Sequence, residues 1–118
     1  METATLTDQV LSEITAIGRS REPKEAVGVI TPDGSVLELV NRSSSPNNSF
    51  LFRIGDLATT LDVYQLFLSD EEWRNLVIWH THPAGGVGPS RVDMKSKINH
   101  FGHLVVALTP EGPIPAWY

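Results

Sequence analysis

The order of elements predicted from the sequence indicates an α/β fold, a three-layer sandwich whose central mixed, mainly antiparallel sheet is flanked by helices. Two observations carry this prediction. Apolar residues recur at helical spacing in some stretches and form short β-branched runs in others, with turn-forming residues between them. The resulting order is helix, three strands, helix, strand, helix and two strands. The length of 118 residues suits a single domain over 1–118.

The first predicted helix begins at a cap supplied by Thr7 or Asp8 and runs to about Ile17. Its apolar residues are spaced by three and four positions and therefore share one face: Val10, Leu11, Ile14 and Ile17. Gly18 is placed to end this helix, and the segment 19–24 reads as a polar connector.

Three strands are predicted next. The first, over 25–30, is apolar and β-branched after its first residue, and an Asp-Gly turn at 33–34 returns the chain as a partner strand over 36–40. The segment 41–49 contains only polar residues and proline, and it is expected to be a surface loop. A third strand is expected over 50–54.

The second half of the chain opens with a helix that Asp56 is placed to cap and that ends near Ser69. The acidic segment 70–72 is expected to be exposed. The remaining predicted elements are a strand over 76–80, a helix from Ser90 to about Asn99, a strand over 103–108 and a short edge strand over 114–118.

Composition argues against several classes of protein. Apolar residues make up 41% and charged residues 19%, as in ordinary globular domains, and no apolar run approaches the roughly 18 residues of a membrane span. The net charge of −5 and the absence of a Lys/Arg cluster argue against nucleic acid or an anionic membrane as the main partner. With no cysteine, disulfides and thiolate metal sites are excluded, and with no signal sequence the cytoplasm is the expected location.

The stretch that carries the chemistry follows a predicted buried strand. Residues two apart on a strand point to the same side, so His80 and His82 would direct both imidazoles at one point, and Pro83 ends the strand because it has no N–H. Asp93 lies three residues after Ser90, in the first turn of the next predicted helix. Two imidazoles and one carboxylate make a three-ligand zinc site with the fourth position left for water.

Ser-x-x-Asp before a helix is also an ordinary capping box, in which the two residues only satisfy backbone N–H groups of the first turn. Taken alone, this pattern favours capping over ligation. Its joint occurrence with His-x-His-Pro shifts the interpretation toward zinc. The two roles are compatible, because the Ser90 backbone can start the helix while its hydroxyl faces the metal.

These residues resemble the motif of the JAMM zinc metallopeptidases, which are MPN domains of the JAB/Mov34 type: an upstream glutamate, His-x-His-Pro, a spacer and Ser-x-x-Asp. His80, His82, Ser90 and Asp93 match this motif without insertion or deletion. The resemblance implies a cytidine deaminase-like sandwich and a Zn²⁺ cofactor held by His80, His82 and Asp93. The chain lacks the long insertions of the family's eukaryotic deubiquitinases, so it is similar to the compact prokaryotic and bacteriophage members.

Metal-assisted hydrolysis also needs a carboxylate that is not itself a ligand, and Glu22 and Glu25 are the candidates. The family glutamate precedes a strand and has glycine three residues on, which Glu25 and Gly28 match, whereas Glu22 lies in the polar connector. Without the metal motif, Glu25 would read as a solvated residue at a strand start. With it, Glu25 is expected to act as general base, and Ser90, matching the family serine, to donate its hydroxyl to the tetrahedral oxyanion.

The expected function is zinc-dependent hydrolysis of a peptide or isopeptide bond in a protein or peptide substrate, such as a ubiquitin-like or other flexible C-terminal tail. Two alternatives stay open: a non-catalytic MPN-type scaffold or phage tail assembly protein, and a small-molecule amidase acting on carrier-protein conjugates. A phage origin would place the protein in the virion or the host cytoplasm. Gly85, Gly86 and Gly88 leave little bulk beside the zinc, which suits a narrow tail, although they could serve only the turn.

Six other residues are expected to have structural roles. His100 and His103 flank the start of a predicted strand, where histidines are mostly structural. Trp79 alternates away from the metal toward the core, and Phe50, Phe52 and Tyr64 are expected to be packing residues.

Overall fold

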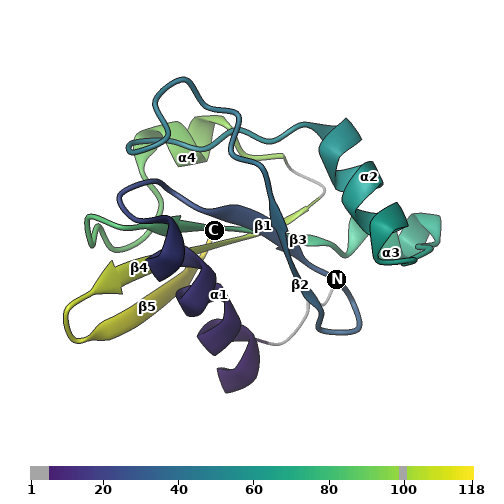
Figure 1. The fold of residues 1–118 in the computed structure, drawn as a ribbon, viewed down its shortest axis with the longest axis horizontal. Helices are drawn as coiled ribbons and strands as arrows, with labels where there is room; N and C mark the ends of the chain where they lie inside the picture. The colour runs from purple at the N-terminus through teal and green to yellow at the C-terminus, as the bar shows by residue number, and fades with distance from the viewer. Residues whose placement is uncertain (1–5, 99–100) are drawn as a thin grey trace.

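The computed structural model describes residues 6–98 and 101–118, and its centre is a five-stranded sheet with the strand order β2-β1-β3-β4-β5 (Figure 1). The strands are β1 (Val27–Ile30), β2 (Val36–Leu39), β3 (Val77–His82), β4 (Gly102–Thr109) and β5 (Gly112–Trp117). The helices are α1 (Asp8–Arg21), α2 (Ile54–Val63), α3 (Asp70–Arg74) and α4 (Arg91–Lys95). Figure 1 shows α1 on one side of the sheet and α2 and α4 on the other, which confirms the predicted α/β sandwich.

The sheet is mixed and mainly antiparallel, as the sequence predicted. β1 runs antiparallel to β2 and β3, β4 runs antiparallel to β5, and within the described sheet only β3 and β4 run parallel. The register places His80 of this central strand between Val27 and Val105. β5 forms one edge, where Pro113 and Pro115 remove two backbone donors.

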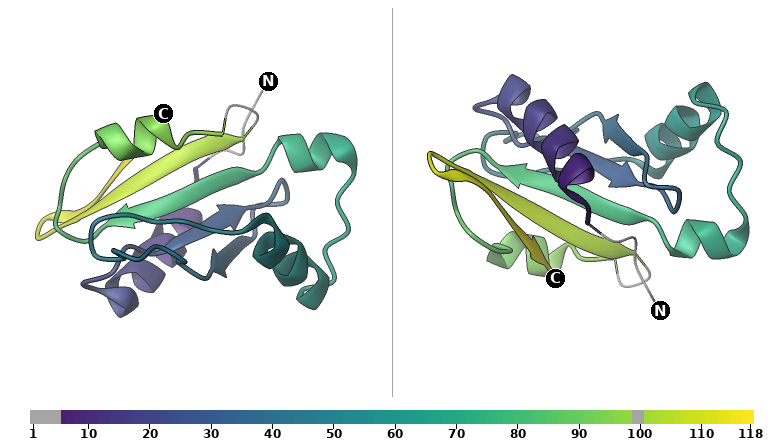
Figure 2. Two further views of the ribbon diagram at one scale, coloured as in Figure 1. Left: turned by 90° about the horizontal axis from the view of Figure 1, so that it is seen from above. Right: turned by 90° about the horizontal axis from the view of Figure 1, so that it is seen from below.

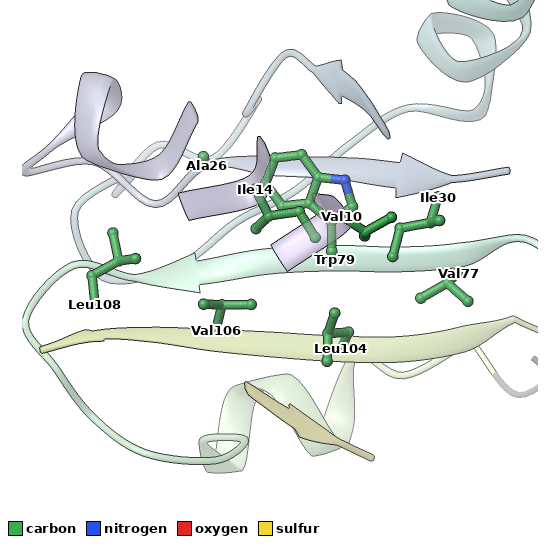
Figure 3. Packing of buried hydrophobic residues seen from close by; sticks show 9 residues of the cluster. All are labelled: Val10, Ile14, Ala26, Ile30, Val77, Trp79, Leu104, Val106 and Leu108. Atoms are coloured by element: carbon green, nitrogen blue, oxygen red, sulfur yellow. The ribbon is translucent and has the colours of Figure 1, made fainter. Parts of the chain in front are cut away.

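One apolar core lies between α1 and the sheet (Figure 3). Its buried members are Val10, Ile14, Ala26, Ile30, Val77, Trp79, Leu104, Val106 and Leu108. Trp79 is fully buried there, and its Nε1–H donates to the Val29 carbonyl at 3.2 Å, so its side chain points away from the opposite face, as predicted. Gly28 makes room for this indole, because a Cβ at Gly28 would lie 2.4 Å from Trp79 Cζ2.

The opposite face of the sheet carries a second apolar core under α2. Its buried members are Val27, Val29, Leu37, Leu39, Leu57, Leu61, Leu76, Ile78 and Phe101. α2 lies over one end of this face and α4 over the other (Figures 1 and 2). The two helices therefore leave the side chains at the C-terminal end of β3 next to α4.

The strand predicted over 50–54 is wrong: the segment before Ile54 has no regular structure, and Ile54 begins α2. Leu51 bonds to the preceding polar loop instead of to a strand, since its N–H donates to Asn41 Oδ1 at 3.1 Å and its carbonyl accepts from Arg42 N at 2.6 Å. The alternating aromatic side chains of this segment still point inward and pack against the α2 core.

α1 continues past Gly18 to Arg21, so Gly18 does not end the helix as predicted. Gly18 is buried against the sheet, where a Cβ would lie 2.8 Å from the methyl carbon of Thr81. The glycine therefore permits close helix–sheet packing. Thr7 supplies the helix cap by accepting the Val10 N–H at 3.1 Å.

α2 begins without a side-chain cap, because Asp56 forms an ion pair with Arg42 at 2.9 Å instead of capping the helix as predicted. The acidic segment 70–72 is the first turn of α3, where Ser69 and Glu72 form a capping box. Carboxylates are favoured there by the positive end of the helix dipole. α2 accordingly ends before the predicted boundary, and a second helix follows it.

β3 extends to His82, so both histidines lie on the strand. α4 ends at Lys95 and residues 96–98 are not helical, so the helix is shorter than predicted, although Asn99 itself lies outside the described residues. Within the described part of the chain, no helix has the length and apolar character needed to cross a membrane.

Replacing Gly28 with alanine is expected to destabilise the protein by about 3 kcal/mol, because the methyl group would overlap the Trp79 indole and the Leu37 carbonyl oxygen. Urea denaturation of the metal-free protein measures this change. Gly55→Ala is the matched control: a Cβ there meets nothing within 4 Å, and alanine favours a helix, so this variant should be at least as stable as the parent. Equal stability of the two variants would contradict the packing role of Gly28.

Candidate metal centre

His80 and His82 occupy alternate positions at the C-terminal end of β3, on the face of the sheet next to α4. The period of two along a strand brings their imidazoles together, and their Nε2 atoms are 3.2 Å apart. His80 is fully buried, whereas His82 is 12% exposed. The pair therefore has one inner member and one member at the rim.

Asp93 reaches the same point from the first turn of α4. Its Oδ2 atom lies 3.1 Å from Nε2 of both His80 and His82. The same oxygen accepts the backbone N–H of Ser90 at 2.8 Å, and Ser90 Oγ accepts the backbone N–H of Asp93 at 3.1 Å, which completes a capping box. Helix capping and convergence on the histidines therefore coexist in one carboxylate.

The three converging atoms form a nearly equilateral triangle with sides of 3.1, 3.1 and 3.2 Å. In a tetrahedral zinc site with bonds of about 2.0–2.1 Å, ligand atoms are about 3.3–3.4 Å apart. Imidazole nitrogen and carboxylate oxygen are both zinc donors, and three of them leave a fourth position open. The donor set and its spacing fit zinc.

Each imidazole has a second polar contact through its other nitrogen. His82 Nδ1–H donates to the Gly86 carbonyl at 2.9 Å, so the neutral ring has its lone pair on Nε2. His80 Nδ1 lies 3.4 Å from the hydroxyl oxygen of Tyr118. The ring of Phe50 stacks on His80 with centroids 4.2 Å apart. These contacts restrict the orientation of both rings.

Glu25 lies two residues before β1 and is only 6% exposed. One of its carboxylate oxygens and one ring nitrogen each of His80 and His82 lie within 4.8 Å of one another. Oε1 of Glu25 has no hydrogen-bond partner in the described part of the chain. Burial raises the pKa of this carboxyl to about 7, with the charge of Asp93 adding to the effect and that of His82 opposing it. Glu25 can therefore exchange a proton near neutral pH.

The backbone of Glu25 is held by the polar loop over 41–49. Its N–H donates to the Pro46 carbonyl at 2.7 Å, and its carbonyl accepts from Asn41 Nδ2 at 2.9 Å. Asn41 Nδ2 also donates to the Ser49 carbonyl at 3.1 Å, while its Oδ1 accepts two further backbone N–H groups. The loop predicted to lie on the surface is thus a folded support for Glu25.

The three converging side chains perturb one another's ionisation. Burial alone would raise the pKa of Asp93, but hydrogen bonds from His80 and His82 hold it far below its usual range. Burial lowers the pKa of His80, whereas in His82 the effect of burial is outweighed by the bonds to Asp93 and Gly86, which raise its pKa. Asp93 is therefore a carboxylate and His80 a neutral imidazole at pH 7, the forms that bind a metal.

Ser90 and the glycine loop line the exposed side of the centre. The Ser90 hydroxyl accepts the Asp93 N–H, so its own proton remains available for donation. Gly85 and Gly88 have φ values of +83° and +78°, which the turn itself requires. A Cβ at Gly86 would meet His82 Nδ1 at 3.7 Å and nothing closer, so this position is open.

The other candidates lie in different surroundings. The carboxylate of Glu22, the alternative base, is half-exposed and forms an ion pair with Arg19 at 3.0 Å. His103 is buried with Nε2 3.0 Å from the Ile98 carbonyl oxygen, and burial lowers its pKa. His100 lies outside the described residues.

Three supports of the centre have no signature in the sequence. Phe50 and Tyr118 are ordinary aromatic residues without a motif, and Asn41 belongs to a polar segment typical of any surface loop. Gly86 is different, because a turn four residues after His82 can return a carbonyl to that ring. Sequence patterns therefore identify the converging side chains but not the contacts that hold them.

Two solution structures match this chain. Protein DSY2949 from Desulfitobacterium hafniense is 24% identical with a TM-score of 0.67, and the match covers 98% of this chain and 82% of that one. A protein from Salinibacter ruber is 20% identical with a TM-score of 0.49, covering 99% and 78% respectively. The first likeness supports the fold alone.

Among curated proteins, none matches this chain. A match to a protein family extends from the cap of α1 to the end of β5. It therefore includes every converging side chain described above. The chain belongs to the family of prokaryotic homologs of the JAB domain, whose model matches residues 7–117.

Proposed function

We propose that this protein is a zinc-dependent peptidase or isopeptidase. The observation that carries the proposal is the convergence of His80, His82 and Asp93 beside the buried Glu25, whose Oε1 has no partner among the described residues. Membership of the JAB family supports the same assignment. In this proposal, the two histidines and Asp93 hold the ion, and Glu25 is the general base.

When bound, zinc supplies a Lewis acid that lowers the pKa of water to about 7 and polarises a substrate carbonyl. Glu25, with a pKa near neutrality, takes a proton from water and returns it to the leaving amine. Ser90 keeps its cap to the Asp93 N–H and donates its hydroxyl proton to the oxyanion of the tetrahedral substrate. Such a contact contributes about 3–4 kcal/mol to lowering the barrier.

An extended, flexible tail is the proposed substrate class. The rim of the centre beside His82 is formed by backbone at Gly86, where a side chain has room and none is present. Small residues next to the cleaved bond, as in the Gly-Gly end of a ubiquitin-like protein, would approach this rim without steric conflict. The other glycines of the loop serve the turn, so Gly86 is the position that supports this proposal.

The first test is metal content. Protein purified without added metal is expected to hold about one zinc per chain, and His80→Ala to hold less than about a tenth of that, because one of three donors is lost. Inductively coupled plasma mass spectrometry measures the content. Glu25→Gln is the control, since a base that is not a ligand should leave zinc in place. A parent without zinc under any condition, or a Glu25→Gln variant that loses it, would contradict these roles.

The second test is turnover. Glu25→Gln is expected to lower kcat on a Gly-Gly-linked fluorogenic peptide by about 100-fold or more, because an amide cannot accept the proton. Glu22→Gln is the matched control and should keep the parent rate, since Glu22 pairs with Arg19. A carrier-protein conjugate of a small amine, assayed in parallel, identifies the amidase alternative. A zinc-loaded parent that cleaves no conjugate would favour the scaffold.

The third test uses pH. The pKa of Glu25 rises from its ordinary 4.5 to about 7 on folding, so the stability contributed by its protonated form is complete below about 4.5 and is lost as pH rises through 7. Glutamine does not titrate. In metal-free protein, the Tm advantage of Glu25→Gln over the parent should therefore be larger at pH 8 than at pH 5, by about 5 °C. A difference that does not change with pH would show that Glu25 is not buried in this way.

A further inference from the structure

Tyr118 lies against the metal centre, and the proposed chemistry gives it no role. Its N–H donates to the His103 carbonyl at 3.0 Å, which continues the β5 ladder, and its ring lies beside the His103 ring with centroids 5.2 Å apart. From there the ring meets His80 edge to face, with centroids 6.0 Å apart. The hydroxyl oxygen ends 3.4 Å from His80 Nδ1.

A histidine that binds a metal through Nε2 must carry its proton on Nδ1, and in a buried site that proton needs an acceptor. For His82 the acceptor is the Gly86 carbonyl. His80 is fully buried, and among the described residues the Tyr118 hydroxyl is the one polar group within hydrogen-bond distance of its Nδ1. The two ligands of β3 therefore have different acceptors, one from the backbone and one from a side chain.

The competing tautomer of His80 would obstruct metal binding. With the proton on Nε2, His80 would donate it to Asp93 Oδ2 at 3.1 Å, so the ligand atom would carry a proton and the carboxylate would already be occupied. Stacking of Phe50 on the ring face restrains the plane of the imidazole but does not distinguish its two nitrogens. Once zinc occupies Nε2 the proton is on Nδ1, and the Tyr118 hydroxyl is then positioned to accept it.

We infer that Tyr118 is a positioning residue for zinc binding: its hydroxyl accepts the Nδ1 proton of His80 and keeps the Nε2 lone pair directed at the metal. This inference rests on the proposed zinc site and adds a residue that no motif includes. Among the described hydrogen bonds, the Tyr118 hydroxyl has none to Asp93 or to either Nε2 atom, and its polar contact with the converging side chains is with His80.

Tyr118→Phe removes only the hydroxyl and keeps the ring contacts with His80 and His103. Competition with a chromophoric chelator at pH 7.5 measures zinc affinity, and this variant is expected to bind zinc about tenfold more weakly than the parent. Tyr64→Phe is the matched control: Tyr64 is 61% exposed, and the loss of its hydroxyl should leave affinity unchanged. Equal affinities of the two variants would overturn the role of Tyr118.

A second measurement distinguishes positioning from general support of the fold. In ¹H–¹⁵N spectra of the zinc-loaded parent, the Nδ1 proton of His80 should resonate downfield, as a hydrogen-bonded proton does, and it should move upfield in zinc-loaded Tyr118→Phe. A zinc-loaded parent whose His80 Nδ1 proton lacks this downfield shift would overturn the inference even if the variant failed to fold.

The failure of this inference and the failure of the proposed function are distinguishable. A parent that binds zinc with the same affinity as Tyr118→Phe contradicts the positioning role and leaves the peptidase proposal intact. A parent that binds no zinc contradicts both. A tenfold loss of affinity with an unchanged Tm of the metal-free protein supports the inference.

Discussion

The burial of β3 on both faces is the constraint on which the rest of the structure depends. Trp79 fills the core under α1, while His80 and His82 point to the face covered by α4. Because side chains alternate along a strand, a register shift of one residue would put an imidazole into the apolar core and the indole into the candidate metal centre. The fit of Trp79 over Gly28 opposes such a shift. The core thus sets the geometry of the site.

A second constraint on the geometry of the centre is local to α4. This helix has five residues and is too short to be stable by its own propensity. Reciprocal bonds between Ser90 and Asp93 start it, and the Asp93 oxygen that accepts the Ser90 N–H also faces both imidazoles. A glycine-rich loop can therefore precede the helix without making the position of the Asp93 carboxylate imprecise, because the cap itself orients that carboxylate. The folding of α4 and the assembly of the centre depend on one oxygen atom.

Patterns that depend on near neighbours in the chain were predictable from the sequence. Strand alternation predicted the convergence of His80 and His82 and the burial of Trp79, and Ser-x-x-Asp predicted the cap; the mixed sheet followed from the predicted order of elements. The roles of these residues as ligands and of Glu25 as base stay predictions, as does the single-domain organisation.

The predictions failed where contacts distant in sequence decide the outcome. The aromatic alternation at 50–54 is typical of a strand, yet hydrogen bonds with Asn41 and Arg42 hold that segment as a loop. A glycine is typical of a helix end, but at Gly18 the missing side chain instead permits close contact of the helix with Thr81. Tyr118 becomes part of the centre only because β5 pairs with β4.

The two prolines of β5 have a consequence of a different kind. A sheet can grow into an open-ended polymer only if both of its edges accept a new strand, and β5 lacks two of the donors that a neighbour would need. The sheet therefore does not offer two fully open edges, and copies of the chain could not stack through it without limit.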